Sequence, residues 1–271
     1  MRLGPITGAT LIVRNLERSL AAYSDQLGMV QVGSEVIPLQ RALDMGETTL
    51  QNARVARLRA RADAAPWLSL IEVPHAPLTP PRRGWLALVL TVADVDALTA
   101  LVDRGIWQVL GEPAETLSAP ATRSLQMVGP DGEVLRLIQR QPIASDDRSP
   151  ARAVVDRLFG VVLGAADCAT ALGFYEGLGL FDRWRLPVHA HTPDLGGVPS
   201  LIPAAFGRLG GAEVLEIDQV PALPTNDSTL RTGLRLISFA RSDRSGQRLV
   251  AQNDPSARIL AGPEGEGIEL V

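Results

Sequence analysis

The sequence predicts an α+β protein built from two tandem domains, each with two βαβββ modules around a curved mixed sheet. One observation is a strand–turn–helix phrase at Ile6–Met29 that returns at Leu158–Leu180. Another is a closing hairpin, PDGEVLRL at Pro130–Leu137 and PEGEGIEL at Pro263–Leu270. Repeats of this kind indicate that one structural unit is used several times along the chain.

The two copies of the phrase agree in detail. Asn15 and Asp167 follow the strand, where a short polar side chain favours the start of a helix. Tyr23 and Tyr175 lie at the same distance further along, on the helix. We expect both tyrosines to pack between helix and sheet, with a ligand contact as the alternative for Tyr175.

Apolar periodicity, capping residues and turn residues place the elements of each module. Module one is expected to contain a strand at Ile6–Val13, a helix at 16–27, a strand at Val30–Val36, and a hairpin of Arg54–Arg61 with Trp67–Val73. Module two is expected to contain a strand at Trp85–Val92, a helix at Val95–Arg104 capped by Asp94, and a hairpin of Ser124–Val128 with Glu133–Gln139. Module three spans Leu158–Val220, and its last hairpin turns at Gly210–Gly211. Module four spans Thr229–Val271, with strands at Gly233–Phe239 and Gly267–Val271 and a helix after Asp243.

The most polar and turn-prone run of the chain is Gln141–Pro150, which we interpret as the domain boundary. The N-terminal domain then spans residues 1–142, and the C-terminal domain spans residues 152–271. Each domain is expected to hold two consecutive modules.

Composition excludes several functions. The net charge of −4 argues against a nucleic-acid partner, which usually meets a basic patch. The chain has no lysine, so Schiff-base chemistry, pyridoxal phosphate catalysis and a phosphate-loop lysine are excluded. No apolar run approaches the length that a bilayer requires, and no signal peptide is evident. The single cysteine, Cys168, fits a reducing cytoplasm, where we expect the protein to reside.

The four modules, each opening with a strand and a helix and closing on a PxG hairpin, resemble the vicinal oxygen chelate superfamily. This superfamily includes glyoxalase I, extradiol dioxygenases, and fosfomycin- and bleomycin-resistance proteins. The resemblance covers nearly the whole chain and implies curved sheets that enclose a ligand. Because one scaffold of this kind carries several chemistries, the resemblance alone does not select one.

The resemblance also implies where a divalent metal would be held, on the first and last strands of the modules. The first-strand positions are Gly8, Ala87, Gly160 and Leu236, and the last-strand positions are Glu72, Arg136, Glu216 and Glu269. None of the first-strand residues can bind a metal, and zinc or iron sites ordinarily include histidine or thiolate. We therefore expect no metal and no other cofactor.

Glu216 and Glu269 are the first candidates for catalysis, because the resemblance places them opposite each other across a C-terminal sheet. Two carboxyl groups in an apolar site raise each other's pKa and can move a proton. The alternative is that they point to solvent or meet arginines such as Arg235 or Arg258.

His189 and His191 are the second pair of candidates. A strand would place both on one face, although the prolines around them favour a loop equally. General acid/base catalysis, metal ligation and a surface position are all open for them. Substrate contacts are assigned to the scarce aromatic residues and one arginine: Tyr175, Trp184, Phe206 and Arg235.

Two functions follow from this pattern. The first is a metal-independent lyase or isomerase that acts on a small hydrophobic or aromatic metabolite by acid/base chemistry. The second is a non-catalytic protein that binds and sequesters such a molecule. A weaker third interpretation is a metalloenzyme, glyoxalase-like or dioxygenase-like, with rebuilt ligands at His189, His191 and Glu216. The expected partner is a small ligand, without nucleic acid or membrane, and a homodimer is left open.

Overall fold

The computed structural model describes most of the chain in atomic detail. The described residues are 2–61, 63, 65–78, 80–102, 104–115, 122–139, 154–190, 200–211, 213–227, 229–242 and 258–271. The boundary run Gln141–Pro150, the candidate His191 and the helix expected after Asp243 lie outside them. Among the described helices, none has the length and apolar character needed to span a bilayer.

The elements follow the four predicted modules. Module one comprises β1 (Arg2–Val13), α1 (Leu16–Leu20), the π-helix η1 (Ala21–Gln26), β2 (Val30–Val36), α2 (Leu39–Asp44), the 3₁₀ helix η2 (Thr48–Leu50), β3 (Arg54–Arg59) and β4 (Leu68–Glu72). Module two comprises β5 (Gly84–Val92), α3 (Val95–Leu101), β6 (Gln108–Glu115), β7 (Arg123–Val128) and β8 (Val134–Gln139). Module three comprises β9 (Val155–Ala165), α4 (Cys168–Gly177), β10 (Phe181–Ala190), β11 (Ser200–Arg208) and β12 (Val214–Gln219). Module four comprises β13 (Gly233–Ser242), β14 (Arg258–Ala261) and β15 (Gly267–Leu270).

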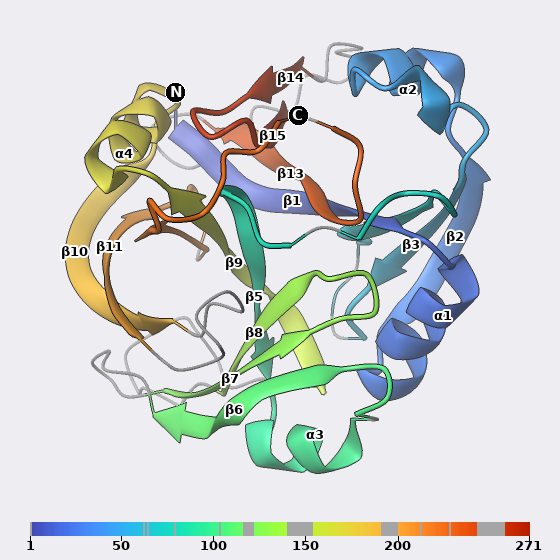
Figure 1. The fold of residues 1–271 in the computed structure, drawn as a ribbon, viewed down its shortest axis with the longest axis horizontal. Helices are drawn as coiled ribbons and strands as arrows, with labels where there is room; N and C mark the ends of the chain where they lie inside the picture. The colour runs from blue at the N-terminus through green and yellow to red at the C-terminus, as the bar shows by residue number, and fades with distance from the viewer. Residues whose placement is uncertain are drawn as a thin grey trace.

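These strands form two curved mixed sheets, which confirms the predicted α+β class (Figure 1). The first sheet has seven strands in the order β14-β15-β13-β1-β4-β3-β2. The second has eight strands in the order β10-β11-β12-β9-β5-β8-β7-β6. In Figure 1, β1 and β13 run side by side in the first sheet, as β5 and β9 do in the second.

The strand order corrects our expectation that two consecutive modules share a sheet. Modules one and four form the first sheet, and modules two and three form the second. The first strands of these modules pair antiparallel, β1 with β13 and β5 with β9. None of these four strands is therefore an open edge of its sheet. At Gly4 an added Cβ would lie 2.1 Å from the carbonyl oxygen of Ala240, so only glycine permits this approach of β1 to β13. Whether residues 1–142 and 152–271 fold as separate units stays a prediction.

Consecutive modules meet instead through their helices and turns. The hydroxyl of Tyr23 on η1 donates to Glu133 in the turn of module two, and Tyr175 on α4 donates to Glu266 in the turn of module four. All four residues are part of the buried or nearly buried interior. One large core runs behind both sheets and includes these tyrosines. Their expected packing between helix and sheet is confirmed.

Candidate functional site

The concave face of the first sheet is covered by the chain itself. Module one inserts α2 and η2 between β2 and β3, and this insertion was not expected from the sequence. Ala42, Met45 and Leu50 from the insertion pack against Ile12 and Ile71 of the sheet, and all five side chains are buried. This face is therefore a second hydrophobic core.

Glu269 lies on this closed face. It forms an ion pair with Arg41 of α2 and accepts a hydrogen bond from the hydroxyl of Ser238. Glu216 lies on β12 of the other sheet, so the expectation that Glu216 and Glu269 meet across one sheet is wrong. The error comes from the pairing of modules, because each glutamate has the predicted position within its own module.

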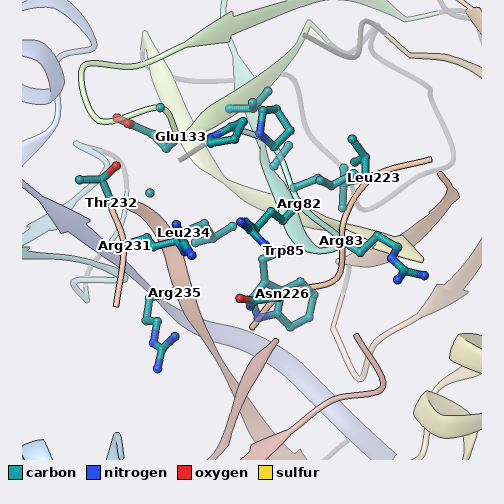
Figure 2. A pocket seen from close by; sticks show the side chains of 18 of the residues that line it. Arg82, Arg83, Trp85, Glu133, Leu223, Asn226, Arg231, Thr232, Leu234 and Arg235 are labelled. Atoms are coloured by element: carbon teal, nitrogen blue, oxygen red, sulfur yellow. The ribbon is translucent and has the colours of Figure 1, made fainter. Parts of the chain in front are cut away.

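The concave face of the second sheet bears a cavity of about 130 Å³. Its floor is formed by side chains of strands of the second sheet, and its rim by the segments that precede β5 and β13 together with the first residues of β13. Residues of the floor include Ala87, Gln126, Val134, Arg136, Val162 and Asp218, and residues of the rim include Arg82, Arg83, Leu223, Asn226, Arg231 and Arg235. Figure 2 shows this rim, where strands and segments far apart in the sequence converge.

Two residues of the cavity floor, Arg136 and Asp218, belong to a charged cluster that includes Glu216. Nη1 of Arg136 on β8 donates to both carboxylate oxygens of Glu216 at 2.5 Å, and its Nη2 lies 3.7 Å from Oδ2 of Asp218. Glu216 and Asp218 alternate on β12 and therefore share one face of the strand. This pair forms because modules two and three share a sheet.

Asp218 and Arg136 both have pKa values that depart from their ordinary values. Burial, together with the neighbouring Glu216 carboxylate, raises the pKa of Asp218 well above its ordinary value, and Arg136 opposes this only in part. Burial would lower the pKa of Arg136, but Glu216 and Asp218 outweigh it and raise that pKa. Oδ1 of Asp218 and Nε of Arg136 are buried and have no hydrogen-bond partner within the described part of the chain. The floor thus places a carboxyl group with a raised pKa beside a fixed cation.

Neither sheet offers residues that fit the metal implied by the fold. In the second sheet the four positions are Ala87, Arg136, Gly160 and Glu216, so a guanidinium stands where a ligand is needed. A Cβ at Gly160 would lie 2.5 Å from the carbonyl oxygen of Val214, so no side chain fits there. The described residues contain no cluster of three or more His, Cys, Asp or Glu side chains that could hold a metal.

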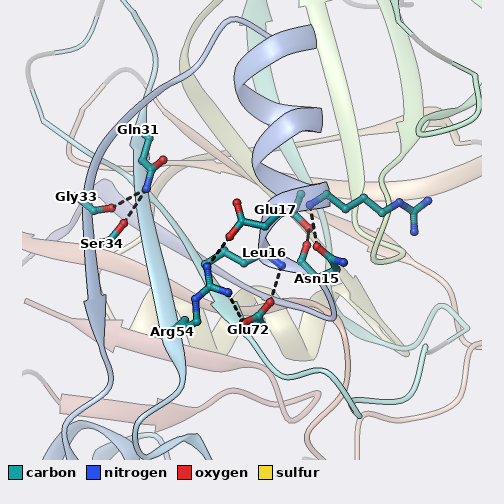
Figure 3. A network of polar contacts seen from close by, with 10 residues as sticks. Asn15, Leu16, Glu17, Gln31, Gly33, Ser34, Arg54 and Glu72 are labelled. Carbon is teal, nitrogen blue, oxygen red and sulfur yellow. Dashed lines mark hydrogen bonds and ion pairs between the residues drawn. The ribbon is translucent and has the colours of Figure 1, made fainter.

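In the first sheet the corresponding glutamates already have partners. Glu72 accepts the backbone N–H of Leu16 at 2.9 Å and pairs with Arg54 at 3.2 Å. Figure 3 shows Arg54 between Glu72 and Glu17, next to the start of α1. Glu72 therefore holds the helix to the sheet, and Glu269 holds α2.

Two aromatic candidates lie on the same face as the ion pair. Trp184 and Phe206 stack at 5.3 Å between ring centroids and 5° between ring planes. Phe206 is paired with Trp184 on β10 and with Glu216 on β12, so all three point to one face of the second sheet. Their assignment as substrate contacts stays a prediction.

The remaining candidates are more dispersed. His189 follows Trp184 by an odd number of residues on β10, so it points to the opposite face, where it is exposed. His191 lies outside the described residues. Tyr175 is fully buried, bonded to Glu266, and does not line the cavity, whereas Arg235 does. Cys168 is buried, and burial raises the pKa of its thiol to about 11, so it is no activated nucleophile.

Sequence reasoning missed Asp218, Arg82 and Arg231. Asp218 could have been found, because it lies two residues after Glu216 on a predicted strand. Arg82 and Arg231 lie in linking segments, whose position depends on how distant modules pair.

The sequence matches no family profile and no curated protein. The fold is similar to glyoxalase I from Zea mays, with a TM-score of 0.61, 18% identity, and coverage of 98% of this chain and 91% of that chain. A mutant of the same enzyme gives a TM-score of 0.64 at 17% identity, covering 98% of this chain and 92% of that one.

A proposed dioxygenase from Bacillus subtilis is also similar, with a TM-score of 0.66 and 11% identity over 99% of this chain and 85% of that chain. Identities this low concern the fold and not the activity. The tandem modules, the two curved sheets and these likenesses agree: the chain has the fold of the vicinal oxygen chelate superfamily.

Proposed function

We propose that the protein is a metal-independent lyase or isomerase that binds a small hydrophobic or aromatic metabolite in the cavity of the second sheet. The observation that carries this proposal is Asp218, a buried acid whose Oδ1 has no partner among the described residues and which lines the cavity. A carboxyl group with a raised pKa can both give and take a proton near neutral pH.

Arg136 supports the same chemistry. Its guanidinium is held in place by Glu216 and lies beside Asp218. A fixed cation stabilises negative charge that develops on a substrate oxygen when a neighbouring proton is removed. In an isomerisation, Asp218 gives its proton to one substrate atom and receives one from another, so it ends in its starting state.

A non-catalytic binding protein is the second candidate. Glu216 already engages Arg136 through both oxygens, and apolar side chains such as Val134, Val162 and Leu234 line the cavity, so the site also suits simple retention of a hydrophobic guest. Glu269 and His189 lie away from the cavity and take no part in either proposal. A cytoplasmic location and a homodimer remain proposals that rest on composition and on the fold.

Deuterium exchange separates the two candidates. Unsaturated and aromatic metabolites that raise the melting temperature would be incubated with the protein in D₂O and followed by NMR. We expect the wild type to introduce deuterium into such a ligand. Asp218→Asn should still bind the ligand but lose this exchange.

Glu269→Gln is the matched control, because this carboxylate lies on the closed face of the other sheet. We expect this variant to keep both ligand binding and deuterium exchange. If bound ligands never exchange, the protein is a binder. If Glu269→Gln stays folded and loses exchange, the reactive centre lies in the first sheet.

A further inference from the structure

We propose that the cavity selects a small organic acid, whose carboxylate is held between Arg82 and Arg231 while its apolar part lies against the floor. This inference rests on the proposed function in one respect, that the cavity holds a small organic ligand. It adds the charge of that ligand and the residues that recognise it.

The rim holds two guanidinium groups close to a single carboxylate. Nη2 of Arg231 lies 2.8 Å from Oδ2 of Asp227, and Nη1 of Arg82 lies 3.6 Å from the same oxygen. Figure 2 shows Arg82 and Arg231 directed towards each other, whereas Arg83 and Arg235 point away from them. One carboxylate therefore serves two cations, and a second anion between them would complete the charge balance.

Both arginines also carry an unused donor. Nε of Arg82 and Nε of Arg231 are buried and have no hydrogen-bond partner among the residues that the structure describes, and the same is true of Nε of Arg136 on the floor. A buried N–H of a cationic group without an acceptor is unfavourable. The planar fork of arginine matches a carboxylate, which supplies acceptors to both partners.

The charges around the cavity favour an anion as well. Five described arginines line it: Arg82, Arg83, Arg136, Arg231 and Arg235. Of the acidic residues around them, Glu133 and Asp218 have a pKa raised chiefly by burial. Glu216 and Asp218 lie beside Arg136, and Glu264 lies beside Arg83. Among the described residues, Asp227 is the one carboxylate that forms ion pairs with both Arg82 and Arg231, so these two cations share a single negative charge.

The apolar lining of the cavity explains why the anion should be organic. Val134, Val162, Leu223 and Leu234 line the cavity together with the methyl group of Ala87. An inorganic anion would leave this apolar surface uncovered, whereas a short aliphatic or aromatic acid would cover it.

The test uses acids and their neutral amides as matched probes. Benzoate, benzamide, hexanoate, hexanamide and inorganic phosphate would be titrated into the wild type by calorimetry at constant ionic strength. We expect at least one acid to bind and its amide to bind roughly tenfold more weakly or worse, because a charged hydrogen-bond pair is lost. Equal binding of acid and amide overturns the inference but leaves the proposed function standing. Binding of phosphate alone, or of none of the probes at millimolar concentration, also overturns it.

Variants then assign the residues. Arg231→Gln and Arg82→Gln should each weaken binding of the acid by roughly tenfold and leave the affinity for the amide unchanged. Arg231→Lys keeps the positive charge but loses the planar guanidinium. Its affinity for the acid should lie between that of the glutamine variants and that of the wild type. Arg57→Gln is the control, because Arg57 pairs with Glu35 at an exposed position on β3. If the folded Arg231→Gln and Arg82→Gln variants bind the acid as the wild type does, the assignment is wrong.

Discussion

The hydroxyl of Tyr23 donates a hydrogen bond to the buried carboxyl group of Glu133 at 2.9 Å, and the repeat of this pair, Tyr175 and Glu266, makes the same bond at 2.6 Å. Each bond joins a helix to the PxGE turn of the next module. The first sheet joins module one to module four, and the second sheet joins module two to module three. The two hydrogen bonds join module one to module two and module three to module four. Every module is thus tied to two others, by a sheet and by a buried polar contact.

The first prediction concerns these bonds. Tyr23→Phe and Tyr175→Phe should each lower the free energy of unfolding by about 1–3 kcal/mol, because each leaves a buried carboxyl group without its donor. Urea denaturation followed by circular dichroism would measure the loss. Ser34→Ala, which removes an exposed hydrogen bond with Gln31, should change little and is the control. A tyrosine variant as stable as this control would show that the bond is absent in solution.

The second prediction concerns pH. Burial, and then the Asp131 carboxylate, raise the pKa of Glu133 from 4.5 to about 7. The folded protein therefore holds a proton that the unfolded chain has already released, and this favours folding at low pH. As the pH rises from about 4.5 to about 7, Glu133 should reduce the free energy of unfolding by on the order of 3 kcal/mol.

Glu133→Gln isolates this contribution. The variant cannot ionise at this position, so its stability should fall less than that of the wild type between pH 5 and pH 8. Urea denaturation at several pH values gives both curves. Parallel curves would mean that Glu133 titrates as it does in the unfolded chain.

Local features of the fold could be predicted from the sequence. Asn15, Asp94 and Asp167 each accept a backbone N–H at the start of a helix, as short polar residues in those positions indicated. Gly84 and Gly233, at equivalent places in modules two and four, both have positive φ values. These features depend on a few neighbouring residues, which is why the sequence reveals them.

Module one differs from module three by one extra residue in the helical region, and this difference is visible in the sequence. One residue more separates Tyr23 from Gly28 than separates Tyr175 from Gly179. The structure accommodates this residue in the π-helix η1, while α4 remains a regular α-helix. The predicted helix at 16–27 is therefore correct in extent but divided in type.

The candidate site could not be predicted because it depends on which modules pair, and local sequence patterns do not determine that pairing. Four similar modules can pair in several ways, and nothing local distinguishes β1–β13 from β1–β5. The incorrect choice separated Arg136 from Glu216 and joined Glu216 to Glu269. The short helix α2, which closes the first sheet, carries too few residues for its periodicity to show.

The third prediction tests this closed face. Leu50 is fully buried in the cluster that covers the first sheet. Leu50→Ala should lower the free energy of unfolding by about 2–5 kcal/mol, as for a residue of the main core, because it leaves a cavity. Leu101→Ala, at a position that is 72% exposed, should cost less than about 0.5 kcal/mol. Similar losses in the two variants would mean that this face is open to solvent.

The fourth prediction concerns the ion pair on the floor of the cavity. Arg136→Met leaves the buried carboxylate of Glu216 without its partner and should lower the free energy of unfolding by about 3–5 kcal/mol. It should also raise the pKa of Asp218 further, because Arg136 opposes that rise in the wild type. The double variant Arg136→Met/Glu216→Leu should recover much of the stability, since no unpaired charge remains there.

Burial, and not the length of the contact, should decide the size of this effect. Arg123 pairs with Asp96 through two hydrogen bonds of 2.6 and 2.7 Å, but both side chains are exposed. Arg123→Met should therefore cost far less than Arg136→Met, because water solvates the remaining carboxylate. Chemical denaturation of the single and double variants provides a double-mutant cycle for each pair. A coupling energy as small for Arg136 and Glu216 as for Arg123 and Asp96 would contradict the buried pair, and with it the fixed cation on which proton transfer by Asp218 depends.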